Sequence, residues 1–215
     1  MAATSHPLAT LAAVETLKAG GNALDAAIAA TAVHCVVEPQ MTSIGGDCFA
    51  ILGLPDGSLK GLNGSGRSAA AMTLEAAQAV DPAGIPKDHG IAVTVPGAID
   101  AWATMLAAHG TMGLDRVLQP AIDIAERGFP VFPRVASDWA DGVDKLSRDE
   151  GGRAHYLKPD GSAPVAGDLM QMPELARTLR LIADKGPDAF YKGAVAEDIV
   201  TAVAKRGGLL TEDDL

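Results

Sequence analysis

The segment Asn63-Gly64-Ser65-Gly66-Arg67-Ser68 has residue types that could bind an anion. Glycine on both sides of a serine gives a flexible backbone whose N–H groups could meet a carboxylate. Arg67 adds a guanidinium, whose planar fork of donors matches a carboxylate with two hydrogen bonds. A substrate-carboxylate site built on Arg67 and Ser65 is one interpretation. An arginine that caps a loop or pairs with a surface acid is the other, and spacing alone does not separate them.

The other candidate groups form no recognised catalytic or metal-binding pattern. Five histidines are scattered along the chain, and none has a serine or cysteine partner in a G-x-S-x-G or H-E-x-x-H motif. Cys35 and Cys48 form no C-x-x-C pair, which disfavours a disulfide framework or a structural zinc site. Residues 43–47 lack the phosphate-loop pattern and predict a tight glycine connection. We therefore expect neither a metal nor a cofactor.

The composition predicts an acidic globular protein. The 215 residues are 48% hydrophobic, and 17 Lys+Arg against 27 Asp+Glu give a net charge of −10. This charge disfavours binding to nucleic acid or to an anionic membrane surface. The longest apolar stretch, residues 26–37, is shorter than the roughly 20 residues that span a bilayer. Since no secretory leader is recognisable, we expect a cytoplasmic protein.

Periodicity and Gly/Pro signals predict a mostly helical chain with one β-hairpin. Apolar spacing predicts a helix from Leu8 to Gly20, and Asn22 caps a second, apolar helix that ends at Val37. Residues 48–54 are expected to form a fully buried strand, with 58–62 as its hairpin partner. The remaining expected elements are a strand at 91–95, helices at 98–108, 114–127, 136–146, 173–185 and 190–206, and loops at 128–134 and 158–168. Thr211 begins a further helix, which suggests that a longer protein continues beyond Leu215.

Short motifs occur in order along nearly the whole chain. They are Ser5-His6-Pro7-Leu8-Ala9, Gly20-Gly21-Asn22-Ala23-Leu24-Asp25-Ala26-Ala27, Val37-Glu38-Pro39, Ile44-Gly45-Gly46, Val95-Pro96-Gly97, Pro120-Ala121-Ile122, Gly128-Phe129-Pro130-Val131, Gly186-Pro187-Asp188-Ala189-Phe190-Tyr191 and Gly207-Gly208-Leu209-Leu210-Thr211. In this order they strongly resemble the N-terminal large subunit of the γ-glutamyltranspeptidase family.

The resemblance implies an α+β fold, the αββα sandwich of N-terminal-nucleophile (Ntn) hydrolases. Residues 1–215 would form a single, incomplete large-subunit domain that supplies the helix-rich part and a hairpin of the central sheet. In this family a precursor cuts itself, and the new N-terminal threonine attacks a γ-glutamyl or related amide with its own α-amine as general base. That threonine would lie beyond Leu215. No catalytic residue is therefore expected in this chain, which alone should be inactive.

The same resemblance implies the partners and leaves the substrate open. We expect a small subunit from the same precursor, a small amide substrate, and a dimer of such heterodimers. The family's transpeptidases have an arginine where alignment places Ser65, whereas Arg67 comes two residues later. This form, with Gly46-Asp47 in place of a longer glycine run, resembles the acylase-like branch. An acylase for dicarboxylic or lactam side chains and a non-catalytic scaffold or binding segment remain as alternatives.

Overall fold

The computed structural model describes all 215 residues, which group into two compact units. The first unit contains residues 1–43 and 108–183, and the second contains residues 44–107 and 184–215. Helices dominate both units, and the sheets are two antiparallel pairs of strands. The expected α+β class, a helix-rich part with a hairpin, is confirmed. The expectation of a single domain over 1–215 stays a prediction.

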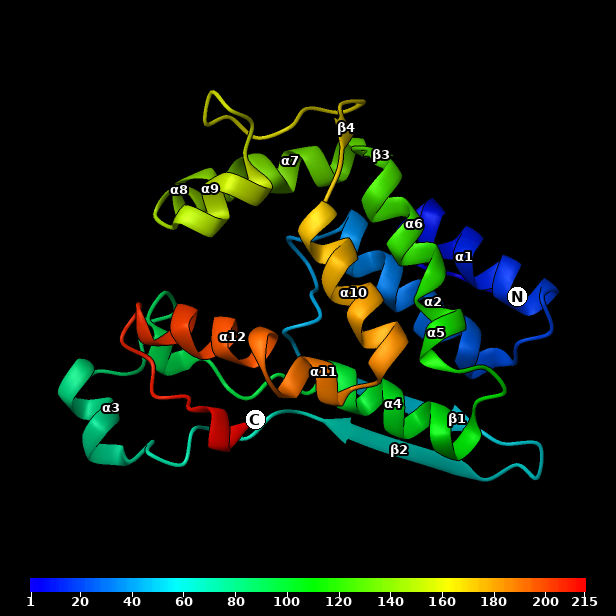
Figure 1. Ribbon diagram of the computed structural model, residues 1–215, viewed down its shortest axis with the longest axis horizontal. Coiled ribbons are helices and arrows are strands. Elements are labelled where there is room, and N and C mark those ends of the chain that lie inside the picture. Colours follow the sequence, from blue (N-terminus) through cyan, green and yellow to red (C-terminus); the bar gives the residue numbers. More distant parts are fainter. The chain divides into compact units, whose positions relative to one another are not determined.

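Helices α1 (Pro7–Lys18) and α2 (Ala23–Val37) pack together in the first unit (Figure 1). α1 begins at His6, whose Nδ1 accepts a hydrogen bond from Leu8 N–H, and it has proline at its first position. α2 is buried on nearly all sides, and Val33 and Val36 are fully enclosed. Its many alanines let neighbouring helices approach closely. Both helices confirm the sequence predictions.

Asp25 fixes the start of α2 and joins it to a loop far along the chain. Asn22 N–H donates to Asp25 Oδ2 at 2.7 Å in a capping box. Asp25 is fully buried and also accepts hydrogen bonds from the Thr111 N–H, the Thr111 hydroxyl and the Met112 N–H. Burial raises the pKa of Asp25, but these hydrogen bonds together outweigh it and lower the pKa from its ordinary value. The carboxylate therefore ties the segment around Thr111 to α2.

Further elements complete the first unit. They are α5 (Leu114–Val117), α6 (Gln119–Arg127), β3 (Phe129–Pro130), α7 (Pro133–Asp141), α8 (Val143–Ser147), α9 (Glu150–Tyr156), β4 (Leu169–Met170) and α10 (Pro173–Lys185, whose last two residues belong to the second unit). α5 and α6 pack against α2, and β3 pairs with β4. The expected helix 114–127 is divided at Leu118, because Pro120 has no N–H to continue the hydrogen-bond ladder. The expected helix 136–146 is divided at Gly142.

The second unit combines a hairpin with helices. Its elements are β1 (Cys48–Gly53), β2 (Leu59–Gly64), α3 (Leu74–Val80), the 3₁₀ turn η1 (Gly90–Ala92), α4 (Ala98–His109, whose last two residues belong to the first unit), α11 (Asp188–Tyr191), α12 (Ala194–Ala204) and the 3₁₀ turn η2 (Glu212–Asp214). α12 packs against α11, η1 and η2. The expected helix 190–206 is divided at Gly193, whose φ of 71° is left-handed and suits glycine.

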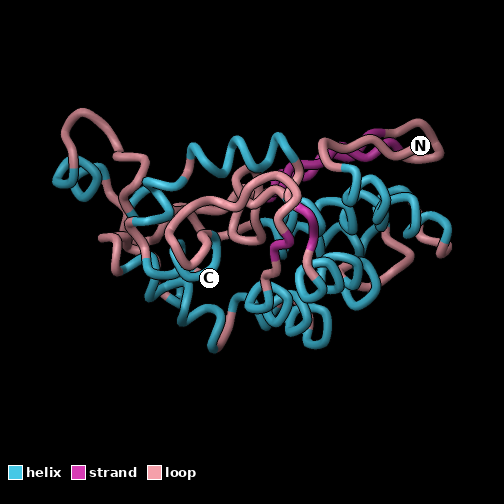
Figure 2. Tube along the Cα trace, turned by 90° about the horizontal axis from the view of Figure 1, so that it is seen from above, coloured by secondary structure: helices cyan, strands magenta, loops and turns pink.

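The strand at 48–53 is half-exposed, so the prediction of a fully buried strand is wrong. β1 and β2 form a two-stranded antiparallel ribbon (Figure 2, magenta). Phe49, Ile51 and Leu59 lie on one face of it and are 67%, 81% and 73% exposed. The opposite face, with Cys48, is partly buried. The apolar residues of β1 lie on both faces of the hairpin, and this chain partly covers only the face that contains Cys48.

Residues 91–95 do not form the predicted strand. η1 is a 3₁₀ turn capped by His89, whose Nδ1 accepts from Ile91 N–H, and Val93 continues in extended conformation. Val95 N–H donates to Arg67 O at 2.9 Å, but no ladder of such bonds follows. This mostly apolar run therefore makes turn hydrogen bonds and one hydrogen bond to the Arg67 segment in place of a sheet ladder.

None of the helices is both long enough and apolar enough to cross a lipid bilayer.

Candidate functional site

Ser65 and Arg67 lie on the loop that leaves the hairpin after β2, where the sequence predicts them. Gly64 is the last paired residue of β2. The loop then runs beside the extended segment that leads into α4, and Val95 N–H donates to Arg67 O at 2.9 Å. The backbone at Arg67 is thereby fixed from a second segment of the chain.

The same segment is joined to the turn before β1. Gly46 O accepts hydrogen bonds from Gly97 N–H and Ala98 N–H at 3.0 and 2.9 Å. Three pieces of backbone therefore meet around the candidate loop, all within the second unit. Their arrangement depends on main-chain hydrogen bonds, which substitutions of the Ser65 and Arg67 side chains would leave in place.

Close backbone packing explains two of the glycines at this junction. A Cβ atom on Gly66 would lie 1.5 Å from Val95 O, and one on Gly97 would lie 2.0 Å from Gly64 O. No side chain fits at either position without moving the backbone. Of the two glycines expected to give a flexible anion-binding loop, Gly66 is thus explained by close contact between segments, and a Cβ atom on Gly64 would likewise lie 2.8 Å from Cys48 O.

Two amides of this loop, those of Ser65 and Gly66, are occupied within the chain. Ser65 N–H donates to Asn63 Oδ1 at 3.0 Å, and Gly66 N–H donates to Asp47 Oδ1 at 3.3 Å. The sequence prediction that these N–H groups are available to an anion is therefore wrong for both. The reason is that the Asn63 side-chain amide oxygen closes a local Asx turn, and Asp47, before β1, contributes a carboxyl oxygen.

The side chains of Arg67 and Ser65 are exposed and make no hydrogen bond or ion pair in the structure. A surface arginine paired with an acid was the alternative interpretation, and the structure shows no such partner. The guanidinium is thus available to a ligand carboxylate, for which it has a matching pair of donors. Arg67 and Ser65 are brought to one loop, but no third side chain joins them as a donor.

Cys48, at the start of β1, is not set up as a nucleophile. Burial raises the pKa of its thiol, and a hydrogen bond with the buried Trp102 on α4 only partly offsets this. A reactive cysteine needs the opposite shift, because the thiolate is the attacking species. Cys48 therefore acts as a packing residue between hairpin and helix.

Tyr191 is a residue that the sequence reasoning did not single out as part of the site. Its hydroxyl donates to Pro96 O at 2.8 Å and accepts from Asp100 N–H at 3.0 Å. It thereby holds the first turn of α4 in place beside the segment that contacts Arg67. Burial raises the pKa of Tyr191, which keeps the hydroxyl protonated and able to donate. Only the Gly186–Tyr191 motif could have pointed to it.

Two histidines of the first unit, the buried His6 and the partly buried His34, form no catalytic pair. His6 is 2% exposed, and burial lowers the pKa of both His6 and His34. Ser5 Oγ donates to Glu38 Oε2 at 2.6 Å, so this hydroxyl has a carboxylate partner and no histidine base. No group of three or more His, Cys, Asp or Glu side chains has a geometry that could hold a metal ion.

Comparison with known proteins places these features in one family. Residues 9–215 match the family described as gamma-glutamyltranspeptidase. The chain is 37% identical to an acylase ACY 1 proenzyme of Pseudomonas sp. (strain SE83) and 38% identical to a glutathione hydrolase-like YwrD proenzyme of Bacillus subtilis. Both alignments cover 100% of this chain, and 40% and 41% of the relatives.

A solved structure agrees with the sequence comparison. The crystal structure of Helicobacter pylori gamma-glutamyltranspeptidase superimposes with a TM-score of 0.93 at 30% identity, over 100% of this chain and 62% of that chain. The chain spans about 40% of the length of the curated relatives it matches. The fold and the sequence match together show that this chain belongs to the γ-glutamyltranspeptidase family.

Proposed function

We propose that residues 1–215 are the front part of the large subunit of an Ntn amidohydrolase or acyltransferase that cleaves a γ-glutamyl or related amide. The observation that carries this proposal is the family match over residues 9–215. In this proposal the nucleophile is a threonine elsewhere in the precursor. Both curated relatives reported above are named proenzymes.

The proposed reaction has two steps. The threonine hydroxyl attacks the amide carbonyl while the threonine's own α-amine takes the hydroxyl proton, and the substrate amine leaves with that proton. Water or another amine then attacks the ester and releases the acyl group from the threonine. In this scheme Arg67 binds the carboxylate of the acyl donor through its unpaired guanidinium, and the Ser65 hydroxyl assists.

An acylase for dicarboxylic or lactam side chains is the second candidate. The Ser65-Gly66-Arg67 spacing and Asp47 favour it, because both depart from the transpeptidase pattern. The two relatives support both candidates almost equally, since the acylase and the glutathione hydrolase-like protein are 37% and 38% identical to the chain. A substrate panel that compares γ-glutamyl-p-nitroanilide, glutathione and glutaryl amides would separate the candidates.

The exposed face of the hairpin supports a small-subunit partner. Phe49, Ile51 and Leu59 form an apolar face on an open-edged two-stranded sheet, a surface that soluble proteins normally cover. In the proposed enzyme, the small subunit covers this apolar face, and its strands pair with the open edges of the sheet. A dimer of such heterodimers and a cytoplasmic location remain predictions from the sequence.

Substitution of Arg67 in the processed full-length enzyme tests the proposed function. Arg67→Ala removes a charge-assisted pair, so kcat/KM should fall roughly ten- to hundredfold, equivalent to about 1.5–3 kcal/mol. Arg67→Lys should recover only part of this, because an ammonium cannot bind a carboxylate through two parallel donors. Lys60→Ala, which removes an exposed positive charge from β2, is the matched control and should leave kcat/KM unchanged.

Intact mass must first show that each variant is cleaved into two subunits. If Arg67→Ala is processed and keeps the wild-type kcat/KM on every active substrate, Arg67 has no role in binding. If wild-type protein is never processed and no amide is turned over, the non-catalytic alternative replaces the enzyme.

A further inference from the structure

The first turn of α4 has no side chain at its own start that could accept its free N–H groups. Gly97 occupies the N-cap position, because its carbonyl oxygen accepts the first helical hydrogen bond, from Ala101 N–H at 3.0 Å. Serine, threonine or aspartate usually stands at this position and accepts from the third helical N–H. Gly97 can be replaced by none of these, since a Cβ atom on it would lie 2.0 Å from Gly64 O. The close packing beside the Arg67 loop therefore requires that α4 be capped by another part of the chain.

Tyr191, the last residue of α11, supplies this cap. Its hydroxyl accepts from Asp100 N–H, the third N–H of α4, at 3.0 Å. The same hydroxyl donates to Pro96 O at 2.8 Å. Figure 1 shows α11 beside the start of α4. One hydroxyl thus joins the first turn of the helix to the residue that precedes its N-cap.

The residues that Tyr191 holds also fix the Arg67 loop. Val95, Pro96 and Gly97 are consecutive, and each is bonded to a different segment. Val95 N–H donates to Arg67 O at 2.9 Å. Pro96 O accepts from the Tyr191 hydroxyl, and Gly97 N–H donates to the turn before β1. Because the proline ring fixes φ at Pro96, a shift of this residue is passed to its neighbours. The backbone at Arg67 therefore depends on the Tyr191 hydroxyl through two hydrogen bonds in series.

We infer that Tyr191 is a positioning residue, which orients Arg67 for the carboxylate of the acyl donor. This role rests on the proposed function of Arg67. Tyr191 itself touches no substrate, because its hydroxyl is occupied on both sides by the backbone before and within α4. Loss of the hydroxyl should therefore weaken recognition of the carboxylate and leave the chemistry at the amide unchanged.

Selectivity for a donor that has the carboxylate is the measurement that tests this role. γ-Glutamyl-p-nitroanilide and 4-aminobutyryl-p-nitroanilide have the same amide and ammonium, but only the first has the carboxylate. Glutaryl- and butyryl-p-nitroanilide form the corresponding pair for an acylase. The processed full-length enzyme is assayed with the pair that it turns over, and the ratio of the two kcat/KM values reports carboxylate recognition. A loss of active enzyme lowers both values by the same factor and leaves the ratio unchanged.

Tyr191→Phe removes the hydroxyl and keeps the ring, which packs edge-on against Phe190 at 5.1 Å between centroids. Two backbone groups at the start of α4 then lose their shared partner, and the Arg67 loop is held less well. The ratio should fall about three- to tenfold, through a higher KM for the donor with the carboxylate. Both donors are assayed on one preparation, so a variant that folds only in part still gives a ratio.

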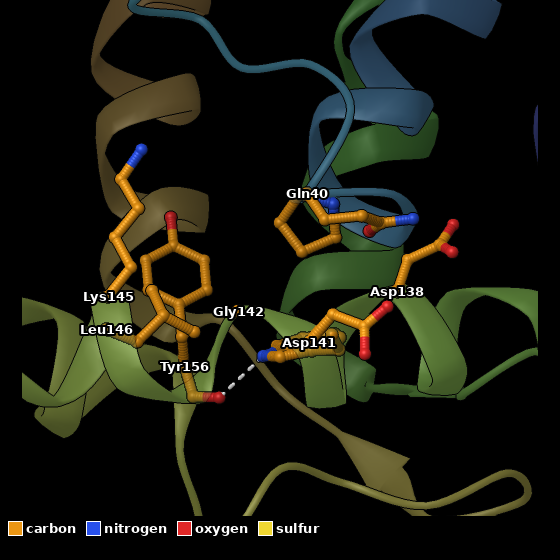
Figure 3. Close-up of a pocket in the computed structure, with 9 residues that line it drawn as sticks. Gln40, Asp138, Asp141, Gly142, Lys145, Leu146 and Tyr156 are labelled. Carbon is orange, nitrogen blue, oxygen red and sulfur yellow. Dashed lines mark hydrogen bonds between the residues drawn. The ribbon is translucent and has the colours of Figure 1, made fainter. Parts of the chain in front are cut away.

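Tyr156→Phe is the matched control, because it removes the same hydroxyl from the other tyrosine of the chain. Tyr156 lies in the first unit, where it lines a cleft between α2 and helices α7 to α9 (Figure 3). Its main-chain oxygen accepts from Trp139 Nε1 at 2.8 Å, and none of the residues that line the cleft belongs to the Arg67 loop. The ratio should stay at the wild-type value.

A double variant separates failure of this role from failure of the proposed function. In the Arg67→Ala enzyme there is no guanidinium to position, so adding Tyr191→Phe should not lower the ratio further. If Arg67→Ala alone leaves the ratio unchanged, the proposed function of Arg67 fails, and the role of Tyr191 fails with it. If Arg67→Ala lowers the ratio but Tyr191→Phe behaves as Tyr156→Phe does, only the role of Tyr191 is wrong. The same holds if Tyr191→Phe lowers the ratio equally with and without Arg67.

Discussion

Helix α2 and strand β1 are both rich in apolar residues, yet the chain buries them to very different extents. α2 is enclosed by α1, α5 and α6, and eleven of its fifteen residues are buried. β1 alternates between half-buried and exposed residues, with Ile51 81% exposed. The helix is therefore packed by residues within 1–215, whereas the strand has an apolar face that this chain does not cover.

The difference indicates where each region obtains its stability. A buried apolar side chain contributes about 1.5–3 kcal/mol to folding, but only where neighbouring atoms exclude water. α2 gains this contribution from the chain itself. The exposed face of β1 gains it only when a second surface covers the face, as the proposed small subunit would.

Loss of Asp25 should have the largest effect on the α2 region. Asp25→Ala leaves the N–H groups of Asn22, Thr111 and Met112 without their carboxylate acceptor in a partly buried setting and empties the buried position of Asp25 itself. We expect the free energy of unfolding to fall by about 3 kcal/mol or more. Urea denaturation of the full-length protein measures this, with Asp144→Ala on exposed α8 as the control. A loss below about 1 kcal/mol would show that water replaces the carboxylate.

Ile51→Ala should have an effect that depends on the partner. In residues 1–215 alone the side chain is exposed, so the change should stay within about 0.5 kcal/mol. In the processed full-length protein a covered Ile51 would lose about 2–3 kcal/mol on truncation. Urea unfolding of both proteins provides the comparison, and Lys60→Ala on the hairpin is the control. An equal, small effect in both would mean that no subunit covers this face.

The sequence predicts elements well where their signals are local. Helix 173–185 is found at the predicted bounds, and α2 begins at the predicted cap Asn22. These ends are set by caps, prolines and glycines within a few residues. The burial of β1 was not predictable from its own residues, because an apolar run looks the same whether one face or both are covered within the chain.

The candidate site shows the same limit. The position of Arg67 and Ser65 after β2 follows from the hairpin, which the local turn signals predict. The hydrogen bond of the Gly66 N–H could not be predicted from local signals, because its acceptor Asp47 is 19 residues away in the sequence. Tyr191 is 95 residues from Pro96, to which its hydroxyl donates. Contacts between residues so far apart in the sequence depend on tertiary packing, and no periodic pattern of residues indicates them.

Acid should weaken the α1–α2 region through the buried His6 and the partly buried His34, and this is the smallest of the three effects. Burial lowers the pKa of His6 and of His34 from the ordinary value of 6.5, although the nearby Glu38 carboxylate raises both and thus reduces the shift. Between the folded pKa and 6.5 the unfolded chain therefore binds more protons than the folded one. Stability should be constant above pH 6.5 and should fall as the pH drops below it.

Thermal unfolding between pH 8 and pH 5 measures this dependence. His34→Gln removes one of the two titrating groups, so the melting temperature should fall less steeply below pH 6.5 than in the wild type. His155→Gln changes an exposed histidine on α9 and should leave the slope as it is. The change of melting temperature with pH is the appropriate readout, because a substitution in this region also changes stability at every pH. A slope that His34→Gln leaves unchanged would mean that the histidine already protonates in the folded state, with Glu38 compensating its burial.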